Sequence, residues 1–234
     1  MYSAAFRTGM RDALGAQAAV LGASYVGFGA LANTGGVSIW VVMASTAMVW
    51  ALPGQLVMVD MWQIGAPAIA TVLAVMLTNA RFLPMTVTLL PVLHARGLAP
   101  WKYYLAAQGI AMSSWMVCMR RCPDMPATER LPYFAGLTCT LMAVSIGAGV
   151  CGFLVANSIP ALMQVGLVFL APVYFFVFLI VEVRSRLAAI AITCGGIAGP
   201  LFYVLTPQWS LLMAGFAGGT VAYVINKLLR RRHA

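Results

Sequence analysis

The stretch "LPYFAGLTCTLMAVSIGAGVCGFLVAN", residues 131–157, contains no charged side chain. It is longer than the roughly 20 apolar residues that a helix needs to cross a bilayer. The absence of charge continues to Val181, and two further uncharged blocks run from Ala13 to Val59 and from Leu187 to Asn226. Each block can hold about two crossings. These blocks predict a polytopic integral membrane protein.

Composition supports this class and indicates helices. The chain is 62% hydrophobic and 8% charged, whereas a soluble domain carries about a quarter charged residues. A membrane β-barrel would alternate apolar and polar residues in short segments, and this pattern is absent. We therefore expect an all-α integral membrane protein, a polytopic helical bundle with broken helices in a single transmembrane domain over residues 1–234.

The apolar runs predict about eight spans, with seven as the alternative. The third run is too long for one straight crossing, so it is either broken near Arg81–Pro84 or strongly tilted. The approximate spans are 13–33, 37–59, 66–95, 100–119, 131–157, 161–182, 187–206 and 209–228.

Positive residues are clustered, which predicts the orientation. Short cytoplasmic loops accumulate Lys and Arg, so we expect both termini and the central loop in the cytoplasm, although eight spans would leave Arg96 and Lys102 outside. We expect no nucleic-acid binding from the net charge of +9, and no cleavable signal peptide. The clusters are Arg7 and Arg11, then Arg120, Arg121 and Arg130, and finally Lys227, Arg230, Arg231 and Arg232.

Two halves of the chain share features in the same order. "GASYVGF" (Gly22–Phe28) and "GAGVCGF" (Gly147–Phe153) are each followed by a small polar pair, Asn33-Thr34 and Asn157-Ser158. Transporters are often built from duplicated halves. We predict a two-fold internal repeat of residues 13–119 and 131–228, and its orientation, parallel or inverted, stays open.

"ALPGQL" (Ala51–Leu56) is the first element that could carry chemistry. Pro53 lacks an amide hydrogen and its ring clashes with the carbonyl of Val49, so the helix kinks or breaks there. The side-chain amide of Gln55 needs partners in an apolar setting. Gln55 either bonds a neighbouring helix or faces a polar substrate.

"LTNARFLPM" (Leu77–Met85) is the second such element. Asn79 and Arg81 lie about 200° apart on an ideal helix, so one regular face cannot carry both. Pro84 would interrupt the helix and leave the carbonyl of Ala80 without a donor. An ionisable residue within a span is a candidate functional residue. Alternatively, Arg81 reaches an interface or pairs with a carboxylate, and Asp60 and Glu182 are the candidates for coupling or gating.

Glycines form the third element. Glycine in a span allows close helix packing, or a break at which substrate meets backbone. Gly22, Gly27, Gly147 and Gly152 are the candidates for such breaks, together with Pro53 and Pro84.

No catalytic or metal-binding pattern occurs. The sequence contains no G-x-S-x-G, no H-E-x-x-H and no glycine-rich phosphate loop. Cys118 and Cys122 have a C-x-x-x-C spacing that does not fit zinc. We expect no enzyme activity, no metal and no cofactor.

The order of these elements resembles the AzlC family of branched-chain amino acid permeases. The resemblance covers about residues 8–206, and the Gln55 and Asn79-x-Arg81 elements are its most specific part. The similar stretches are "GMRDALGAQAAVLGASYVGFGALAN", "ALPGQL", "LTNARFLPMTVTLLPVL", "GLTCTLMAVSIGAGVCGFLVANSIP" and "GLVFLAPVYFFVFLI".

The resemblance implies a secondary transporter in the bacterial inner membrane that exports Leu, Ile, Val or analogues. It also implies a small hydrophobic AzlD-type partner. The alternatives are a non-transporting scaffold subunit or a transporter of another small amino-acid-like solute. The expected substrate-binding residues are Asn33, Gln55, Asn79, Arg81 and Asn157.

Overall fold

The computed structural model describes residues 2–95, 99–158, 160–182, 186–205, 213 and 216–225. These residues form helices and turns, and none of them lies in a β-strand. The predicted all-α class is confirmed for this part of the chain. Two compact units are present, residues 1–172 and 173–234.

The elements of the structure are short compared with the predicted spans. Several apolar runs that the sequence presents as continuous are divided into two helices each. The elements are α1 (Tyr2–Ala13), α2 (Ala16–Thr34), α3 (Ile39–Met48), α4 (Leu52–Gln63), α5 (Ala68–Asn79), α6 (Phe82–Leu93), α7 (Pro100–Gln108), α8 (Met112–Arg121), η1 (Cys122–Asp124), α9 (Ala127–Leu154), η2 (Ala156–Ser158), α10 (Ala161–Glu182) and α11 (Arg186–Leu205).

Helix α9 is the central element of the first unit. In the described part of the chain it is the one helix that is long and apolar enough to cross a membrane by itself. Two bent pairs reach this length when each is counted as one span, α1 with α2 at 59° and α5 with α6 at 51°. An eight-span bundle is therefore not confirmed.

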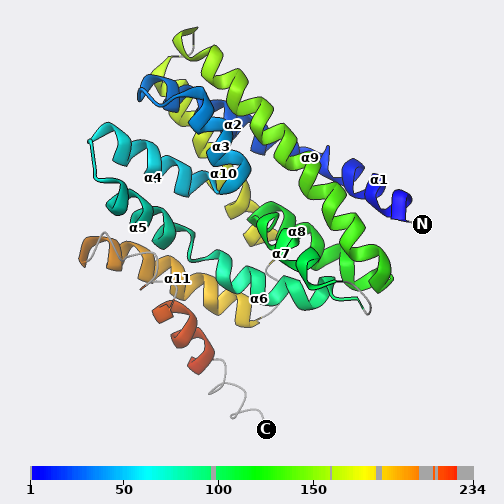
Figure 1. Ribbon diagram of the computed structural model, residues 1–234. Helices are drawn as coiled ribbons and strands as arrows, with labels where there is room; N and C mark the ends of the chain where they lie inside the picture. Colours follow the sequence, from blue (N-terminus) through cyan, green and yellow to red (C-terminus); the bar gives the residue numbers. More distant parts are fainter. Residues whose placement is uncertain are drawn as a thin grey trace. The chain divides into compact units, whose positions relative to one another are not determined.

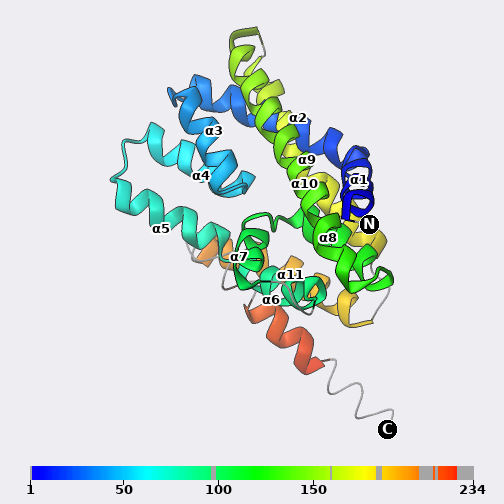
Figure 2. The ribbon, with the colours of Figure 1, turned by 45° about the vertical axis from the view of Figure 1, so that its right-hand side comes forward.

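Helices α1 and α2 lie along α9 and run in the same direction (Figures 1 and 2). A Cβ placed on Gly29 would lie 2.0 Å from the carbonyl oxygen of Gly149, and one on Gly152 would lie 2.0 Å from that of Val26. These distances are shorter than any real contact, so only glycine permits this approach. Small residues at a helix crossing are typical of packing within membranes.

The glycines predicted to break helices do not break them. Gly22 and Gly27 lie inside the uninterrupted α2, and Gly147 and Gly152 inside the uninterrupted α9. Every peptide unit of a helix can be hydrogen-bonded with glycine present, so glycine permits a break without causing one. Gly27 and Gly152 instead allow backbones to approach closely, while a Cβ on Gly147 would meet nothing within 4 Å.

Helices α3 and α4 form a hairpin. A Cβ on Gly35, next to the end of α2, would lie 2.6 Å from Nε2 of Gln63, at the end of α4. Val37, beside the start of α3, lines one cavity together with Trp62. Both open ends of the hairpin therefore lie near the end of α2. The turn at its tip contains Trp50, whose φ of 39° is in the left-handed region.

Helices α7 and α8 form a second hairpin. Its open ends lie at the opposite end of the first unit from those of the α3–α4 hairpin. The start of α7 lies beside Leu131, near the beginning of α9, and Gly109 at its tip meets Thr138. Helix α8 then returns, because Arg121 at its end pairs with Asp12 of α1. The side-chain amide of Gln108 donates to the carbonyl of Met48, so the tips of the two hairpins are in contact.

Helices α5 and α6 run between these two ends. Asn79, at the end of α5, lies against Gly54 at the start of α4. Helix α6 continues to the beginning of α9, where Nη1 of Arg130 donates to the carbonyl of Val92 (3.0 Å). Residues 16–154 thus contain three elements that run from end to end, α2, the α5–α6 pair and α9, and two hairpins.

This arrangement corrects the predicted spans 37–59 and 100–119, both of which turn back. In this topology Lys102 lies at the same end of the first unit as Arg121 and Arg130, because Lys102 lies beside Leu131. Arg96, the other residue that eight spans leave outside, is not among the described residues. The second unit contains the last part of α10, α11 and the helical segment 216–225, and most of the predicted span 209–228 lies outside the described residues.

The glycine contacts lead to a matched pair of variants in α9. We expect Gly152→Ala to destabilise the protein by about 1–3 kcal/mol, because the new methyl group forces α2 and α9 apart. We expect Gly147→Ala to be neutral or stabilising by up to about 1 kcal/mol, because alanine is the better helix former and the site is open. Thermal unfolding of both variants in one detergent checks this order. Equal melting temperatures would contradict the close approach.

Candidate functional site

The predicted break in the helix at "ALPGQL" falls between α3 and α4. Pro53 occupies the second position of α4, where its missing amide hydrogen costs no hydrogen bond. The preceding turn holds Trp50, whose indole Nε1 donates to Oγ of Ser145 in the middle of α9 (3.1 Å). Left-handed backbone is costly for a bulky residue and persists where the surroundings fix it. The bond to α9 and nearly complete burial provide this restraint.

Gln55 is fully engaged within the protein. Its Oε1 accepts from the hydroxyl of Tyr25 (2.9 Å). Its Nε2 donates to Oγ of Ser45 (3.0 Å) and to Oγ1 of Thr46 (2.9 Å). All four residues are buried. The cluster ties α2, α3 and α4 together at the tip of the first hairpin, so the geometry favours the packing interpretation of Gln55 over direct contact with substrate.

The predicted interruption after Asn79 is also present, but its geometry differs from the expectation. Asn79 ends α5 and Arg81 directly precedes α6. The carbonyl of Ala80 is not left free, because it accepts from the amide of Leu83 (3.1 Å). Pro84 lies in the first turn of α6, where helices tolerate the missing donor.

Asn79 and Arg81 each keep an unpaired polar atom at this break. Oδ1 of Asn79 and Nε of Arg81 are buried and have no hydrogen-bond partner among the described residues. A buried polar group without a partner costs roughly 1–3 kcal/mol. The Cζ atom of the guanidinium lies 5.5 Å from the centroid of the Phe82 ring.

The expected ion pairs of Arg81 are not found within the described residues. Asp60 is exposed and forms no ion pair with Arg81. It lies six residues beyond Gly54, about 9 Å further along α4. The side chain of Glu182 is outside the described residues.

Helix ends add to the electrostatics around Asn79. Its side chain lies against the first turn of α4, since a Cβ on Gly54 would be 2.6 Å from both Nδ2 and Oδ1. No side chain caps the first turn of α4 or of α6. The N-terminal end of a helix carries partial positive charge and unpaired N–H groups. Arg81 and these two ends favour an anionic group at the break, while the C-terminal end of α5 at Asn79 contributes the opposite partial charge.

The remaining two asparagines lie elsewhere. Nδ2 of Asn33 donates to the carbonyl of Phe153 (3.0 Å) and so satisfies the end of α9. Asn157 is exposed in η2. The structure therefore places Asn79 against Gly54, two residues before Arg81 in the chain, and places neither Asn33 nor Asn157 beside them.

Sequence reasoning missed the partners of the hairpin tips. The residues concerned are Tyr25, Ser45, Thr46, Trp50, Gln108 and Ser145. Each is a polar or aromatic residue within a mostly apolar run, and Ser45 and Thr46 are neighbours. The position of Trp50 three residues before Pro53 was the only local signal, because a proline near the start of a helix marks the turn that precedes it.

Substitutions of Gln55 and Asn79 are expected to differ in their effect on stability. We expect Gln55→Leu to destabilise the protein by about 1–3 kcal/mol for each buried partner left unsatisfied. We expect Asn79→Leu to leave stability nearly unchanged, since its Oδ1 has no hydrogen bond to lose. Thermal unfolding in detergent measures both. A larger loss in the Asn79 variant would assign Asn79 a structural role.

A family model described as AzlC protein matches residues 17–159, more than half of the 234 residues. No curated protein and no solved structure matches the chain. The match extends from α2 through α9 and contains both hairpins and the broken α5–α6 pair. AzlC is a family of membrane transporters, generally associated with branched-chain amino acids. The chain belongs to the AzlC family.

Proposed function

We propose that this protein is a secondary transporter that exports branched-chain amino acids or close analogues without chemical conversion. One observation carries the proposal. A buried acceptor, Oδ1 of Asn79, and a buried donor, Nε of Arg81, have no hydrogen-bond partner among the described residues at one helix break. An α-amino acid offers the complement, since its ammonium group donates and its carboxylate accepts. Arg81 would bind the carboxylate and Asn79 the ammonium group.

Position in the fold supports this assignment. Asn79 lies beside Gly54, at the level of the fold where both hairpin tips end. Discontinuous helices whose ends meet near the middle of the membrane are the usual substrate sites of secondary transporters. Broken helices are tolerated at this depth when they line a cavity or are buried in protein.

The transport proposal is tested in liposomes that contain the protein and are loaded with labelled leucine or valine. We expect Arg81→Ala to slow efflux about 10–100-fold, because a hydrogen bond to a charged group contributes about 1.5–3 kcal/mol. Leu83→Ala is the matched control, since Leu83 is 70% exposed and lies on the same turn.

Three results decide this experiment. Equal efflux with wild type and Arg81→Ala would remove Arg81 from the site. No efflux of any amino acid by the wild type, with or without a small AzlD-like subunit added, would favour the scaffold alternative. Efflux of a different small amino acid alone would change the substrate.

The proposed location is the bacterial inner membrane, with the cationic end of the first unit in the cytoplasm. Exposed arginines at this end occur on α1 and α8, Arg7, Arg11, Arg120 and Arg121. Excess positive charge marks the cytoplasmic side. This orientation places the open ends of α7–α8 inside the cell and those of α3–α4 outside.

Cysteine labelling tests the orientation and the hairpins together. Ile64→Cys, after α4, should react with an impermeant maleimide in intact cells, because Ile64 is 75% exposed at the outer end. Asp124→Cys, in η1, should react only after the membrane is permeabilised. Mapping of labelled peptides distinguishes the new cysteines from the natural ones. Labelling of both variants from the same side would contradict the arrangement.

A further inference from the structure

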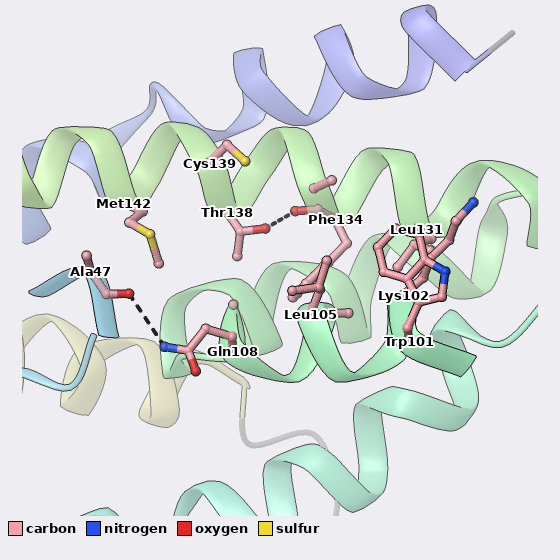
Figure 3. A pocket seen from close by; sticks show the side chains of 13 residues that line it. Ala47, Trp101, Lys102, Leu105, Gln108, Leu131, Phe134, Thr138, Cys139 and Met142 are labelled. Atoms are coloured by element: carbon pink, nitrogen blue, oxygen red, sulfur yellow. Dashed lines mark hydrogen bonds between the residues drawn. The ribbon is translucent and has the colours of Figure 1, made fainter. Parts of the chain in front are cut away.

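A groove of about 450 Å³ lies between α7 and α9 in the first unit (Figure 3). Its walls carry mainly aliphatic and aromatic side chains. The lining residues that the argument uses are Trp101, Lys102, Leu105, Phe134, Cys139 and Met142.

Two polar donors along the inner part of this groove already bond backbone carbonyls. The hydroxyl of Thr138 donates to the carbonyl of Phe134. The side-chain amide nitrogen of Gln108 donates to the carbonyls of Ala47 (3.5 Å) and Met48. A polar solute would lose hydrogen bonds to water without replacing them here, whereas a hydrocarbon chain would lose none.

The length of the groove matches one leaflet of a bilayer. Its lining on α9 runs from Leu131 to Met142, which corresponds to about 16 Å of helix. The hydrocarbon core of a bilayer is about 30 Å thick, so one leaflet contributes about 15 Å. Leu105, on the opposite wall, is 65% exposed and leaves the groove open along its side.

The two ends of the groove differ in charge. Lys102 and Trp101 lie at the end nearest the start of α9, while Met142 and Ala47 lie at the other end (Figure 3). The ammonium group of Lys102 is 5.8 Å from the centroid of the Trp101 ring. Tryptophan beside a basic residue is typical of the interface, where a phosphate group would complement the lysine.

We infer that this groove holds one acyl chain of an anionic glycerophospholipid from the leaflet at the cationic end, with the lipid phosphate at the ammonium group of Lys102. The inference depends on insertion in a membrane and not on the identity of the transported solute. The end of the acyl chain would lie beside Ala47 and Gln108, where the two hairpin tips meet. Bound lipid would therefore support the contact between the tips.

Two natural cysteines on α9 provide the test. Cys139 lines the groove and Cys151 does not, and both are exposed. The full-length protein in detergent is treated with N-ethylmaleimide, with and without added phosphatidylglycerol, and modification at each site is followed by peptide mass spectrometry. At ten times the Kd of the lipid, we expect the reaction at Cys139 to slow about tenfold. We expect the rate at Cys151 to stay unchanged.

Variants of the headgroup contact make the experiment specific. Lys102→Gln should reduce the protection of Cys139 by phosphatidylglycerol, and Lys102→Arg should restore it. Equal protection of both cysteines, or no protection of either, would overturn the inference. Protection by leucine without lipid would make the groove a solute site, and protection by inorganic phosphate alone would make it an anion site. Either result would also refute the lipid assignment.

Discussion

The close packing of α2 against α9 is the constraint on which the rest of the first unit depends. At Gly29 and Gly152 the partner backbone occupies the space that a Cβ would need. Such contacts replace the hydrophobic driving force, which is weak between helices surrounded by lipid. Helix α9 then serves as a common support. Ser145 anchors the tip of one hairpin and Thr138 packs against the tip of the other.

Hydrogen bonding is the main requirement at the places where helices of this apolar chain are interrupted. A broken helix exposes backbone and side-chain groups that hydrocarbon cannot satisfy. At the first tip the side-chain groups of the cluster around Gln55 bond one another. At the break between α5 and α6, Oδ1 of Asn79 and Nε of Arg81 have no partner within the described part of the chain. The contrast separates a polar cluster that stabilises the fold from two polar atoms whose hydrogen-bonding capacity is unused among the described residues.

The residues predicted for the site differ in whether their polar side chains find partners within the protein. The sequence indicates which polar residues stand in apolar runs, and Asn79, Arg81 and Gln55 were all identified in this way. It does not indicate which of them find partners, because those partners, such as Tyr25 for Gln55, lie far away in the chain. Asn33 satisfies the end of α9 and Asn157 is exposed, so neither joins the break. The sequence does not decide whether a glycine serves close packing or a break, because both require the same residue type, and here the candidate glycines lie inside unbroken helices.

Composition and local pattern determined the helical class, the membrane setting, the interruptions near Pro53 and Asn79 and the family resemblance. Each depends on the chemistry of neighbouring residues, which a sequence displays directly. Tertiary structure decided the topology. A hydrophobic run long enough to span a bilayer can also fold back as a hairpin, and hydropathy is the same in both cases. Only contacts between distant residues, such as Gly35 with Gln63 and Gln108 with Met48, distinguish the two.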